Sequence, residues 1–159
     1  MSTLQLQTIT PDTLDQVLDI QAVCYPAHYH EPRSVFARKL ALSPDSHWLA
    51  WRDNEALGYF FTHPWRGLTP PPLATELAGL PPDPDCHFLH DLAIHPRARG
   101  SGVAQALIEH ALAWGRQQQM TKALLVAVQG AAPFWARHGF RELGAAPGYG
   151  DSAILMHRQ

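Results

Sequence analysis

Two side chains that can move a proton, His90 and Asp91, are adjacent in an alternating apolar stretch that reads as a strand. A free imidazole titrates at about pH 6.5, so His90 is suited to accept a proton near neutral pH. Consecutive strand residues face opposite sides of a sheet, and we expect one of the two to face a reaction cleft. His90 is the candidate base, and Asp91 is the alternative base or the anchor of a cationic substrate. A histidine hydrogen-bonded at a strand surface is the competing interpretation.

The strand that carries this pair ends at Pro96 and leads into a turn with Gly100 and Gly102, after which the apolar spacing becomes helical. A glycine turn before a helix leaves backbone N–H groups free, and such groups bind anions, above all phosphate. The turn lacks the Gly-Lys-Ser/Thr triplet of a Walker loop. It departs from the dinucleotide fingerprint at Gln105, and no acidic residue follows at the distance that a ribose contact requires.

The turn matches a third phosphate-binding pattern, Arg/Gln-x-x-Gly-x-Gly/Ala, at residues 99–104. A Leu-Ala-Ile-His-Pro strand end precedes it, and a Phe-Trp-Ala-Arg-His-Gly-Phe segment follows at 134–140. Taken together, these motifs resemble the acetyl-CoA loop of the GNAT superfamily of N-acyltransferases, over residues 87–141.

The resemblance implies that acetyl-CoA is the co-substrate and that amides of the glycine turn bind its pyrophosphate, with charge added by Arg97 or Arg99. It also implies that the pantetheine pairs with the preceding strand where that strand separates from its neighbour. The residues thus expected to bind acetyl-CoA are Leu92, Ala93, Ile94, Arg97, Arg99, Gly100, Ser101, Gly102, Val103, Ala104, Gln129, Phe134 and Trp135.

Residues 88–95 are similar to the corresponding strand of serotonin N-acetyltransferases. The resemblance implies that His90 takes part in removing the proton of the amine, although the second histidine of that pair is replaced here by Phe88.

A tryptophan, Trp135, stands where members of the superfamily commonly have a tyrosine that acts as the acid for the departing thiolate. Tryptophan cannot serve as an acid, and the asparagine often found after the preceding strand is also missing, with Gln129 as a substitute. Tyr149, in a glycine-rich loop, is a candidate replacement acid; packing over the sheet edge is the alternative interpretation. A thiol has a pKa of about 8.5, so coenzyme A can leave with modest help.

The loop between the first two expected helices gathers Tyr25, Tyr29, His30 and Glu31. A carboxylate among aromatic rings suits an ammonium substrate, and we expect these residues to bind the acceptor. Alternatively, Glu31 only stabilises the start of the following helix.

Composition and charge argue against several classes of function. The 159 residues fit one domain spanning 1–159, and a net charge of −2 without a basic run argues against nucleic acid. Residues 2–7 lack the order of a signal peptide, and apolar runs are too short for a membrane span, so we expect a cytoplasmic protein. Ten histidines bring no metal-binding motif, and no metal is expected. Cys24 and Cys86 are expected as free thiols.

Periodicity and turn residues predict two N-terminal helices between short strands, a long proline-rich loop, two strand–helix units and two closing strands. One helical turn is expected at residues 73–77 inside the loop. This order predicts an α/β fold with a mixed, mostly antiparallel sheet and helices on both faces, which also resembles the GNAT fold.

The function that these features favour is acetyl transfer from acetyl-CoA to a primary amine, by direct attack without an acyl-enzyme. Backbone N–H groups of the central strand would polarise the carbonyl. The acceptor is left open between a small amine, an amino-acid derivative and a protein amine. One alternative is a non-catalytic acyl-CoA-binding or sensing module. Another is a homodimer whose partner-facing surface includes the proline-rich loop.

Overall fold

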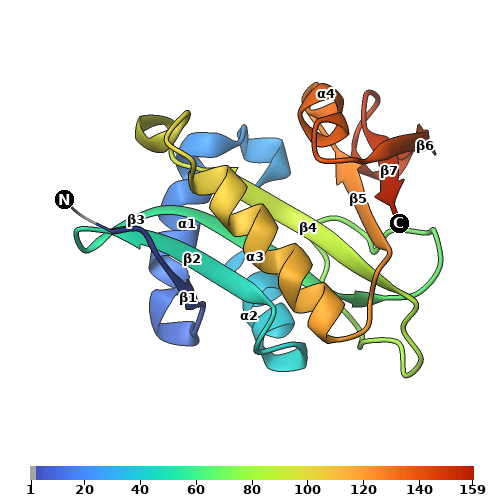
Figure 1. Cartoon of the computed structure of the whole chain (residues 1–159), viewed down its shortest axis with the longest axis horizontal. Helices are drawn as coiled ribbons and strands as arrows, with labels where there is room; N and C mark the ends of the chain where they lie inside the picture. The colour runs from blue at the N-terminus through green and yellow to red at the C-terminus, as the bar shows by residue number, and fades with distance from the viewer. Residues whose placement is uncertain (1–2) are drawn as a thin grey trace.

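The computed structural model describes residues 3–159, which form a mixed α/β fold around one seven-stranded sheet (Figure 1). The strand order across the sheet is β1-β2-β3-β4-β5-β7-β6. Neighbouring strands are antiparallel except β4 and β5, which are parallel. The strands are β1 (Gln5–Thr8), β2 (His47–Arg52), β3 (Glu55–Trp65), β4 (Cys86–Ile94), β5 (Ala123–Ala127), β6 (Arg141–Ala145) and β7 (Ile154–Arg158). The predicted fold class is confirmed.

Helices lie on both faces of the sheet, with α3 on one face and α1 and α2 on the other (Figure 1). Their bounds are α1 (Leu14–Cys24), α2 (Arg33–Leu42), α3 (Val103–Gln117) and the short α4 (Ala132–Ala136). In α3 the predicted apolar face is buried, with Val103, Leu107 and Ala111 fully inside the core. This packing holds the start of α3, and the glycine turn before it, firmly against the sheet.

The proline-rich stretch between β3 and β4 is a long irregular loop. Residues 73–75 form a turn and a bend, and the helical turn expected at 73–77 is absent. β3 itself continues through Pro64, where it pairs with His87 of β4. Its pairing with β2 ends at Phe61, so Pro64 lies where β3 has a strand neighbour on one side only, and the missing N–H is tolerated there.

The parallel strands β4 and β5 separate along their length. They pair only from His87 to Leu89 on β4 and from Ala123 to Leu125 on β5. Beyond this point the strands diverge, as Figure 1 shows, while β4 remains paired with β3 up to Ile94. The residues of β4 after Leu89 therefore have a free edge toward β5, as the resemblance implied.

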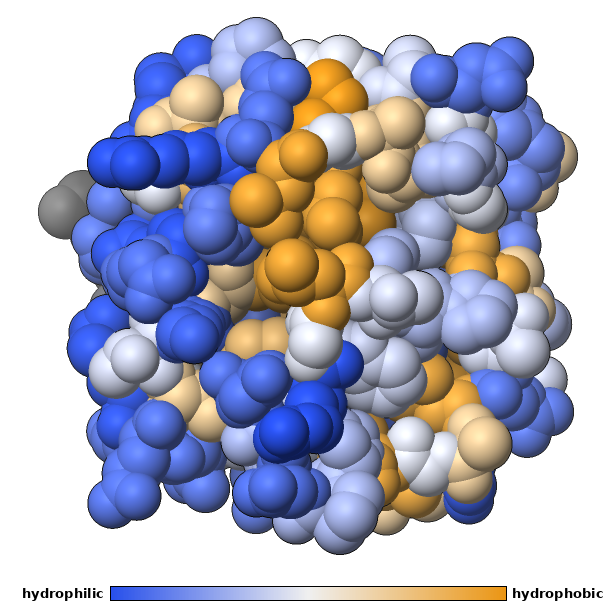
Figure 2. Space-filling model, turned by 90° about the vertical axis from the view of Figure 1, so that its right-hand side faces the viewer, coloured by the Kyte–Doolittle hydropathy of each residue, from blue (hydrophilic) through white to orange (hydrophobic). Residues whose placement is uncertain are grey.

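The side of the molecule formed by α4, β6 and β7 carries an apolar patch. Figure 2 shows apolar side chains gathered in the upper part of this side, bordered by hydrophilic residues. Leu143 of the edge strand β6 is 41% exposed.

Both cysteines are free thiols, as predicted: Cys86 is buried and Cys24 is half-buried. Within residues 3–159, no helix has the length and apolar character needed to cross a membrane. Nor does any group of three or more His, Cys, Asp or Glu side chains in that range have an arrangement that could hold a metal ion.

Three histidines, His47, His63 and His87, are buried in and around β2, β3 and β4. Burial lowers the pKa of His47 and of His87 to about 3, and lowers that of His63 well below its usual range. His47 Nδ1 accepts the Thr62 N–H, and its Nε2 then donates to the carbonyl of Lys39. These histidines are neutral structural groups.

We expect the free energy of unfolding to fall as the pH drops from 7 to 5. Unfolded histidines, with a pKa of about 6.5, bind protons in this range, whereas folded His47 and His87 do not. Because the unfolded state binds more protons, their contribution to stability is complete above about pH 6.5 and declines toward pH 3. At pH 5 each costs about 2 kcal/mol, a large share of an ordinary total of about 5–15 kcal/mol.

Urea unfolding at pH 7, 6 and 5 measures this loss. The control is His47→Gln, because a glutamine amide can both accept from Thr62 N–H and donate to the Lys39 carbonyl without titrating. The variant should lose about 2 kcal/mol less than the parent between pH 7 and 5. Equal losses in the two proteins would contradict the assignment to His47.

Candidate functional site

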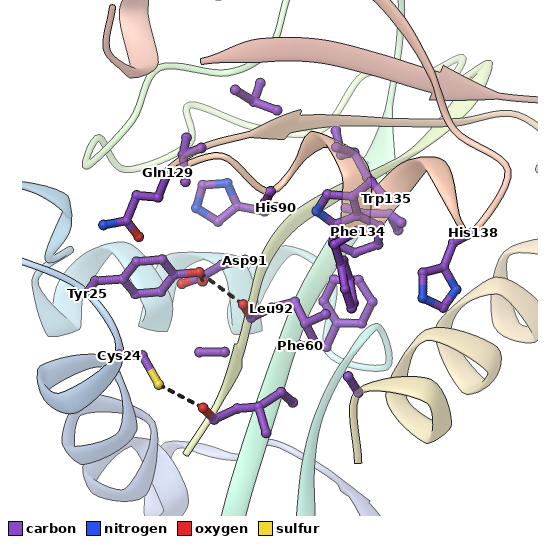
Figure 3. A pocket seen from close by; sticks show the side chains of 18 of the residues that line it. Cys24, Tyr25, Phe60, His90, Asp91, Leu92, Gln129, Phe134, Trp135 and His138 are labelled. Atoms are coloured by element: carbon purple, nitrogen blue, oxygen red, sulfur yellow. Dashed lines mark hydrogen bonds between the residues drawn. The ribbon is translucent and has the colours of Figure 1, made fainter. Parts of the chain in front are cut away.

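A cavity of about 700 Å³ opens where β4 and β5 diverge. Its walls come from the 24–31 segment, β4, the glycine turn, the end of β5, α4 and Tyr149. In Figure 3, Tyr25, His90, Asp91 and Gln129 gather at one side of this cavity, whereas Phe134, Trp135 and His138 lie at the other side. The cavity therefore has room for a ligand between a polar wall and an aromatic wall.

A β-bulge in β4 directs both His90 and Asp91 to one face of the sheet. Phe61 pairs with Asp91 and the next residue, Thr62, pairs with Leu89, so His90 is the extra residue. Both His90 and Asp91 line the cavity. The expectation that they face opposite sides is wrong, because the bulge interrupts the alternation on which it rests.

His90 forms a buried hydrogen bond with Glu31. The distance from His90 Nε2 to Glu31 Oε1 is 2.6 Å, and both side chains are only 2% exposed. Glu31 Oε2 also accepts the N–H of Ala74 at 2.9 Å. Burial alone would raise the pKa of Glu31, but the charge and hydrogen bond of His90 outweigh it and lower the pKa to about 2.

The arrangement leaves one imidazole nitrogen of His90 unused. Because Nε2 bonds to an ionised carboxylate, it carries a proton, and in the neutral imidazole Nδ1 holds the lone pair. Nδ1 is buried and lacks a hydrogen-bond partner within residues 3–159. A buried nitrogen of this kind is completed by a bound water or a ligand atom, which suits a proton acceptor.

Asp91 is held by two tyrosines. Tyr25 Oη lies 3.0 Å from Asp91 Oδ1, and Tyr59 Oη lies 2.9 Å from Asp91 Oδ2. Burial raises the pKa of Asp91 to about 6, helped by the charge of Glu31 and opposed by His90 and the two hydroxyls. Asp91 is thus mostly ionised at neutral pH and can accept a proton, so both candidate bases stay available.

The sequence interpretation did not include Tyr59 or Lys39 in this network. Lys39 is 1% exposed, and burial lowers its pKa while Glu31 and Asp91 act in the opposite direction. Helical periodicity could have predicted that Lys39 is buried, because it lies on the same face of α2 as the buried residues Val35, Phe36 and Leu40. The charges of Glu31 and Asp91 favour the charged form of this buried lysine, whose Nζ has no hydrogen-bond partner within residues 3–159.

The glycine turn lines the cavity away from the Glu31–His90 pair. It has the geometry that the sequence predicted. Gly100 and Gly102 have φ values of 78° and 87°, which L-residues rarely adopt. A Cβ built at either position meets no atom within 4 Å, so the turn faces open space. The first-turn amides of α3 have no intrahelical acceptor, and they are therefore free to bind an anion.

Arg99 and Arg97 have different positions. Arg99 lines the cavity, and its Nε donates to the carbonyl of Ile94 at 3.3 Å. Arg97 lies outside the cavity and forms an ion pair of 3.1 Å with Glu55. Ser101 also lies outside, with its N–H and hydroxyl both donated to the carbonyl of Ala98. Of the expected phosphate-binding side chains, the structure brings only Arg99 to the site.

The remaining expected acetyl-CoA residues line the cavity: Leu92, Ala93, Ile94, Val103, Ala104, Gln129, Phe134 and Trp135. Gln129 has a φ of 54°, a strained value that is common at functional sites. Trp135 is nearly buried and packs against Phe60, Phe134 and Phe140. It shapes the wall of the cavity.

The expected acceptor residues are only partly brought together. Tyr25, Tyr29 and Glu31 line the cavity, but His30 does not. His30 Nε2 bonds to the carbonyl of Tyr25 at 2.6 Å, so it stabilises the segment from behind. Cys24, which the sequence interpretation left out of the site, lines the cavity and donates its thiol to the carbonyl of Ile94.

Tyr149 reaches the cavity wall, but its hydroxyl donates to the carbonyl of Pro71 at 2.6 Å, and burial raises its pKa. We therefore expect Tyr149→Phe to slow the single-turnover transfer of an acetyl group less than about threefold, well below ordinary acid catalysis of 10²- to 10⁴-fold. Rapid-quench measurement at saturating amine tests this, with Trp135→Tyr for comparison. A loss above about 100-fold would restore Tyr149 as the acid.

Comparisons with known proteins identify the family and the fold of the chain. A model of the acetyltransferase (GNAT) family matches residues 14–140. No curated protein matches the chain in sequence. The loading GNATL domain of CurA from Lyngbya majuscula is 14% identical, with a TM-score of 0.81 over 99% of this chain and 98% of that one.

Two further solved structures are similar. The GphF GNAT-like decarboxylase in complex with isobutyryl-CoA is 19% identical, with a TM-score of 0.81 over 97% of this chain and 98% of its own. Arabidopsis thaliana Naa50, in complex with the bisubstrate analogue CoA-Ac-MVNAL, is 16% identical, with a TM-score of 0.73 over 98% of each chain. Identities this low establish a shared fold. The family model spans 127 of the 159 residues, and the chain therefore belongs to the GNAT acetyltransferase family.

Proposed function

We propose that the protein transfers the acetyl group of acetyl-CoA to a primary amine, which attacks the thioester directly while both substrates are bound. The observation that carries this proposal is the single cavity with the glycine turn at one end and the Glu31–His90 pair at the other. The free edge of β4 connects the two ends. A thioester held along this edge would lie beside both candidate bases.

The glycine turn and the start of α3 suit the diphosphate of the co-substrate. Gly100 and Gly102 leave open space where the phosphates would lie, and Arg99 adds a positive charge. A helix N-terminus stabilises each anionic group by about 0.3–1 kcal/mol when exposed. At residues 92–94, where β4 has no β5 partner, the carbonyls of Leu92 and Ile94 accept from Tyr25, Cys24 and Arg99, so the backbone N–H groups of this edge are the groups that would bind the pantetheine and polarise the thioester carbonyl.

In the proposed reaction, the amine nitrogen forms a bond to the carbonyl carbon and the carbon–sulfur bond breaks. The proton of the amine passes to His90 or Asp91, through a bound water where the side chain is out of direct reach. Glu31 orients His90 and stabilises the imidazolium that forms. The thiolate of coenzyme A leaves without a dedicated acid, since its pKa is about 8.5.

Direct attack is favoured over an acyl-enzyme because Cys24, a thiol in the cavity wall, is held in its protonated form. Its thiol donates to the carbonyl of Ile94, and burial raises its pKa despite the opposing charge of Arg99. A protonated thiol is a poor nucleophile. Mass spectrometry after incubation with acetyl-CoA alone should therefore show no acetyl group on the protein.

Calorimetry with acetyl-CoA, followed by free-thiol release over a panel of amines, tests the proposal. Binding together with amine-dependent thiol release supports it. Binding without turnover on any amine favours the acyl-CoA-binding or sensing module, an alternative suggested by Trp135 at the usual position of a tyrosine. Absence of acetyl-CoA binding would refute both functions.

A further inference from the structure

Three loop segments meet over the end of the cavity that holds Glu31 and His90, and we refer to them together as the roof: residues 25–31, 70–78 and 147–151. Three hydrogen bonds join them directly. Tyr29 Oη donates to the carbonyl of Tyr149 at 3.0 Å, and Tyr149 Oη donates to the carbonyl of Pro71 at 2.6 Å. The N–H of Ala74 donates to Glu31 Oε2 at 2.9 Å. Each segment of the roof is thus bonded to the others.

The backbone is adapted to these contacts. A Cβ at Gly150, where φ is 119°, would lie 2.8 Å from the Tyr29 hydroxyl oxygen, so only glycine admits the tyrosine here. Ala74 has a φ of 55°, a costly value for alanine, at the residue whose N–H bonds to Glu31. Two independent local features therefore serve the closure of the roof.

The middle segment is also attached to the body of the protein. Arg38 of α2 donates from Nε to the carbonyl of Leu77 at 2.8 Å and from Nη2 to the carbonyl of Ala78 at 2.9 Å. The Leu77 side chain is itself buried. The 70–78 segment is therefore fixed at both ends of its path across the cavity, at Pro71 and at Leu77.

The hydrogen bonds of the roof also determine which side-chain groups of its inner wall can contact a ligand. The hydroxyl protons of Tyr25, Tyr29 and Tyr149 are all donated to protein oxygens, so these residues present ring surface to a ligand. Leu73 adds apolar surface, together with Val126 and Val128, which pack against the same hydrophobic cluster around Tyr149. The carboxylates of Glu31 and Asp91 supply negative charge at the far end of this apolar space.

We propose that the acceptor is a small primary amine with an apolar body, held beneath the roof, and not the end of a polypeptide. This inference rests on the transfer reaction proposed above. A polypeptide acceptor needs an open channel for the chain that follows its amine, and the three bonded segments lie across that end of the cavity. An ammonium group near Glu31 and Asp91, with a hydrocarbon or ring body against Leu73 and the tyrosine rings, fits the chemistry of the walls.

Binding can be measured apart from turnover. In a calorimetric titration of the full chain saturated with coenzyme A, 2-phenylethylamine should bind at least tenfold more tightly than the pentapeptide Met-Val-Asn-Ala-Leu. Free-thiol release with acetyl-CoA should show the same preference. Equal or tighter binding of the peptide, faster acetylation of the peptide, or no binding of 2-phenylethylamine would each overturn the inference.

The same measurements separate this inference from the proposed function. If 2-phenylethylamine binds the coenzyme A complex but neither amine releases thiol from acetyl-CoA, the transfer reaction fails and the site for a small amine beneath the roof holds. If the peptide is the better acetyl acceptor, the transfer reaction holds and the site for a small amine fails.

A pair of variants in the 66–85 loop tests whether the amine binds under the roof. Leu73 lines the cavity, whereas Leu68 of the same loop is 61% exposed and lies outside it. Leu73→Trp should weaken 2-phenylethylamine binding at least tenfold and leave acetyl-CoA affinity unchanged, whereas Leu68→Trp should change neither. Unchanged amine affinity in a Leu73→Trp protein that still binds acetyl-CoA would overturn the inference. Leu73→Phe, a smaller change with a smaller expected loss, serves if the tryptophan variant does not fold.

Discussion

Replacing Gly102 by valine is expected to weaken acetyl-CoA binding by about 100-fold, a loss of about 2.7 kcal/mol, in a protein that still folds. Gly102 has a φ of 87°, so a β-branched residue strains the turn that leads into α3. A Cβ here meets no protein atom within 4 Å, and the added side chain would therefore occupy the space proposed for the phosphates. Calorimetry gives the affinity, and urea unfolding gives the cost of backbone strain, about 1–3 kcal/mol.

The matched control for this experiment is Gly67→Val. Gly67 also has a positive φ, 79°, and its Cβ would also meet no atom within 4 Å, but it lies in the proline-rich loop outside the cavity. The control carries the same kind of backbone strain without obstructing the phosphate site. We expect it to lose similar stability and to keep its acetyl-CoA affinity. If Gly102→Val folds and binds acetyl-CoA normally, the phosphate assignment is wrong.

The second large effect is expected at the Glu31–His90 pair. His90→Gln should lower kcat by about 10²- to 10³-fold, because it removes a candidate base whose Nε2 is oriented by Glu31. Acetyl-CoA affinity should stay within about threefold, since His90 lies at the opposite end of the cavity from the glycine turn. Glu31→Gln keeps the shape but removes the charge, and we expect it to lower kcat as well.

The pH dependence of the residual rate identifies the base. Where Asp91 is the base, a protonated His90 beside it lowers the pKa of Asp91, which lies at about 6. If Asp91 accepts the proton, His90→Gln raises this pKa, and the acid limb of the kcat profile moves to higher pH. If His90 accepts it, the acid limb disappears in the variant. If the variant keeps the kcat and the pH profile of the parent, His90 neither accepts the proton nor influences the pKa of Asp91.

The parts of the site that follow from local sequence could be predicted. Gly100 and Gly102 adopt the positive φ values that a tight turn before a helix requires, and the apolar spacing after them placed the buried face of α3 correctly. Turn chemistry and helical periodicity act over a few residues, and a single sequence carries them in full. Arg97 shows the limit, because its charge suited the phosphates but Glu55 of a distant strand pairs with it.

The parts that depend on distant contacts could not be predicted. Tyr29 and Tyr149 are 120 residues apart in the chain, and Ala74 and Glu31 are 43 residues apart. No local sequence pattern could therefore predict the hydrogen bonds of the roof. Lys39 follows the periodicity of a buried stripe, but lysine is seldom buried, and the carboxylates of Glu31 and Asp91 that favour its charged form come from other elements of the fold. The bulge at His90 contains no glycine or proline that could have marked it.

That bulge has an evolutionary consequence. One additional residue is enough to give a single strand two neighbouring polar groups on the same face, and losing one residue would undo it. A deletion of one residue between Leu89 and Leu92 would remove His90 or Asp91 and restore simple alternation, while the glycine turn and the hydrophobic core would be kept. A descendant with this deletion would still bind the acyl donor but would no longer have both groups at the reacting end. A change of one codon could therefore convert such an enzyme into a binding protein.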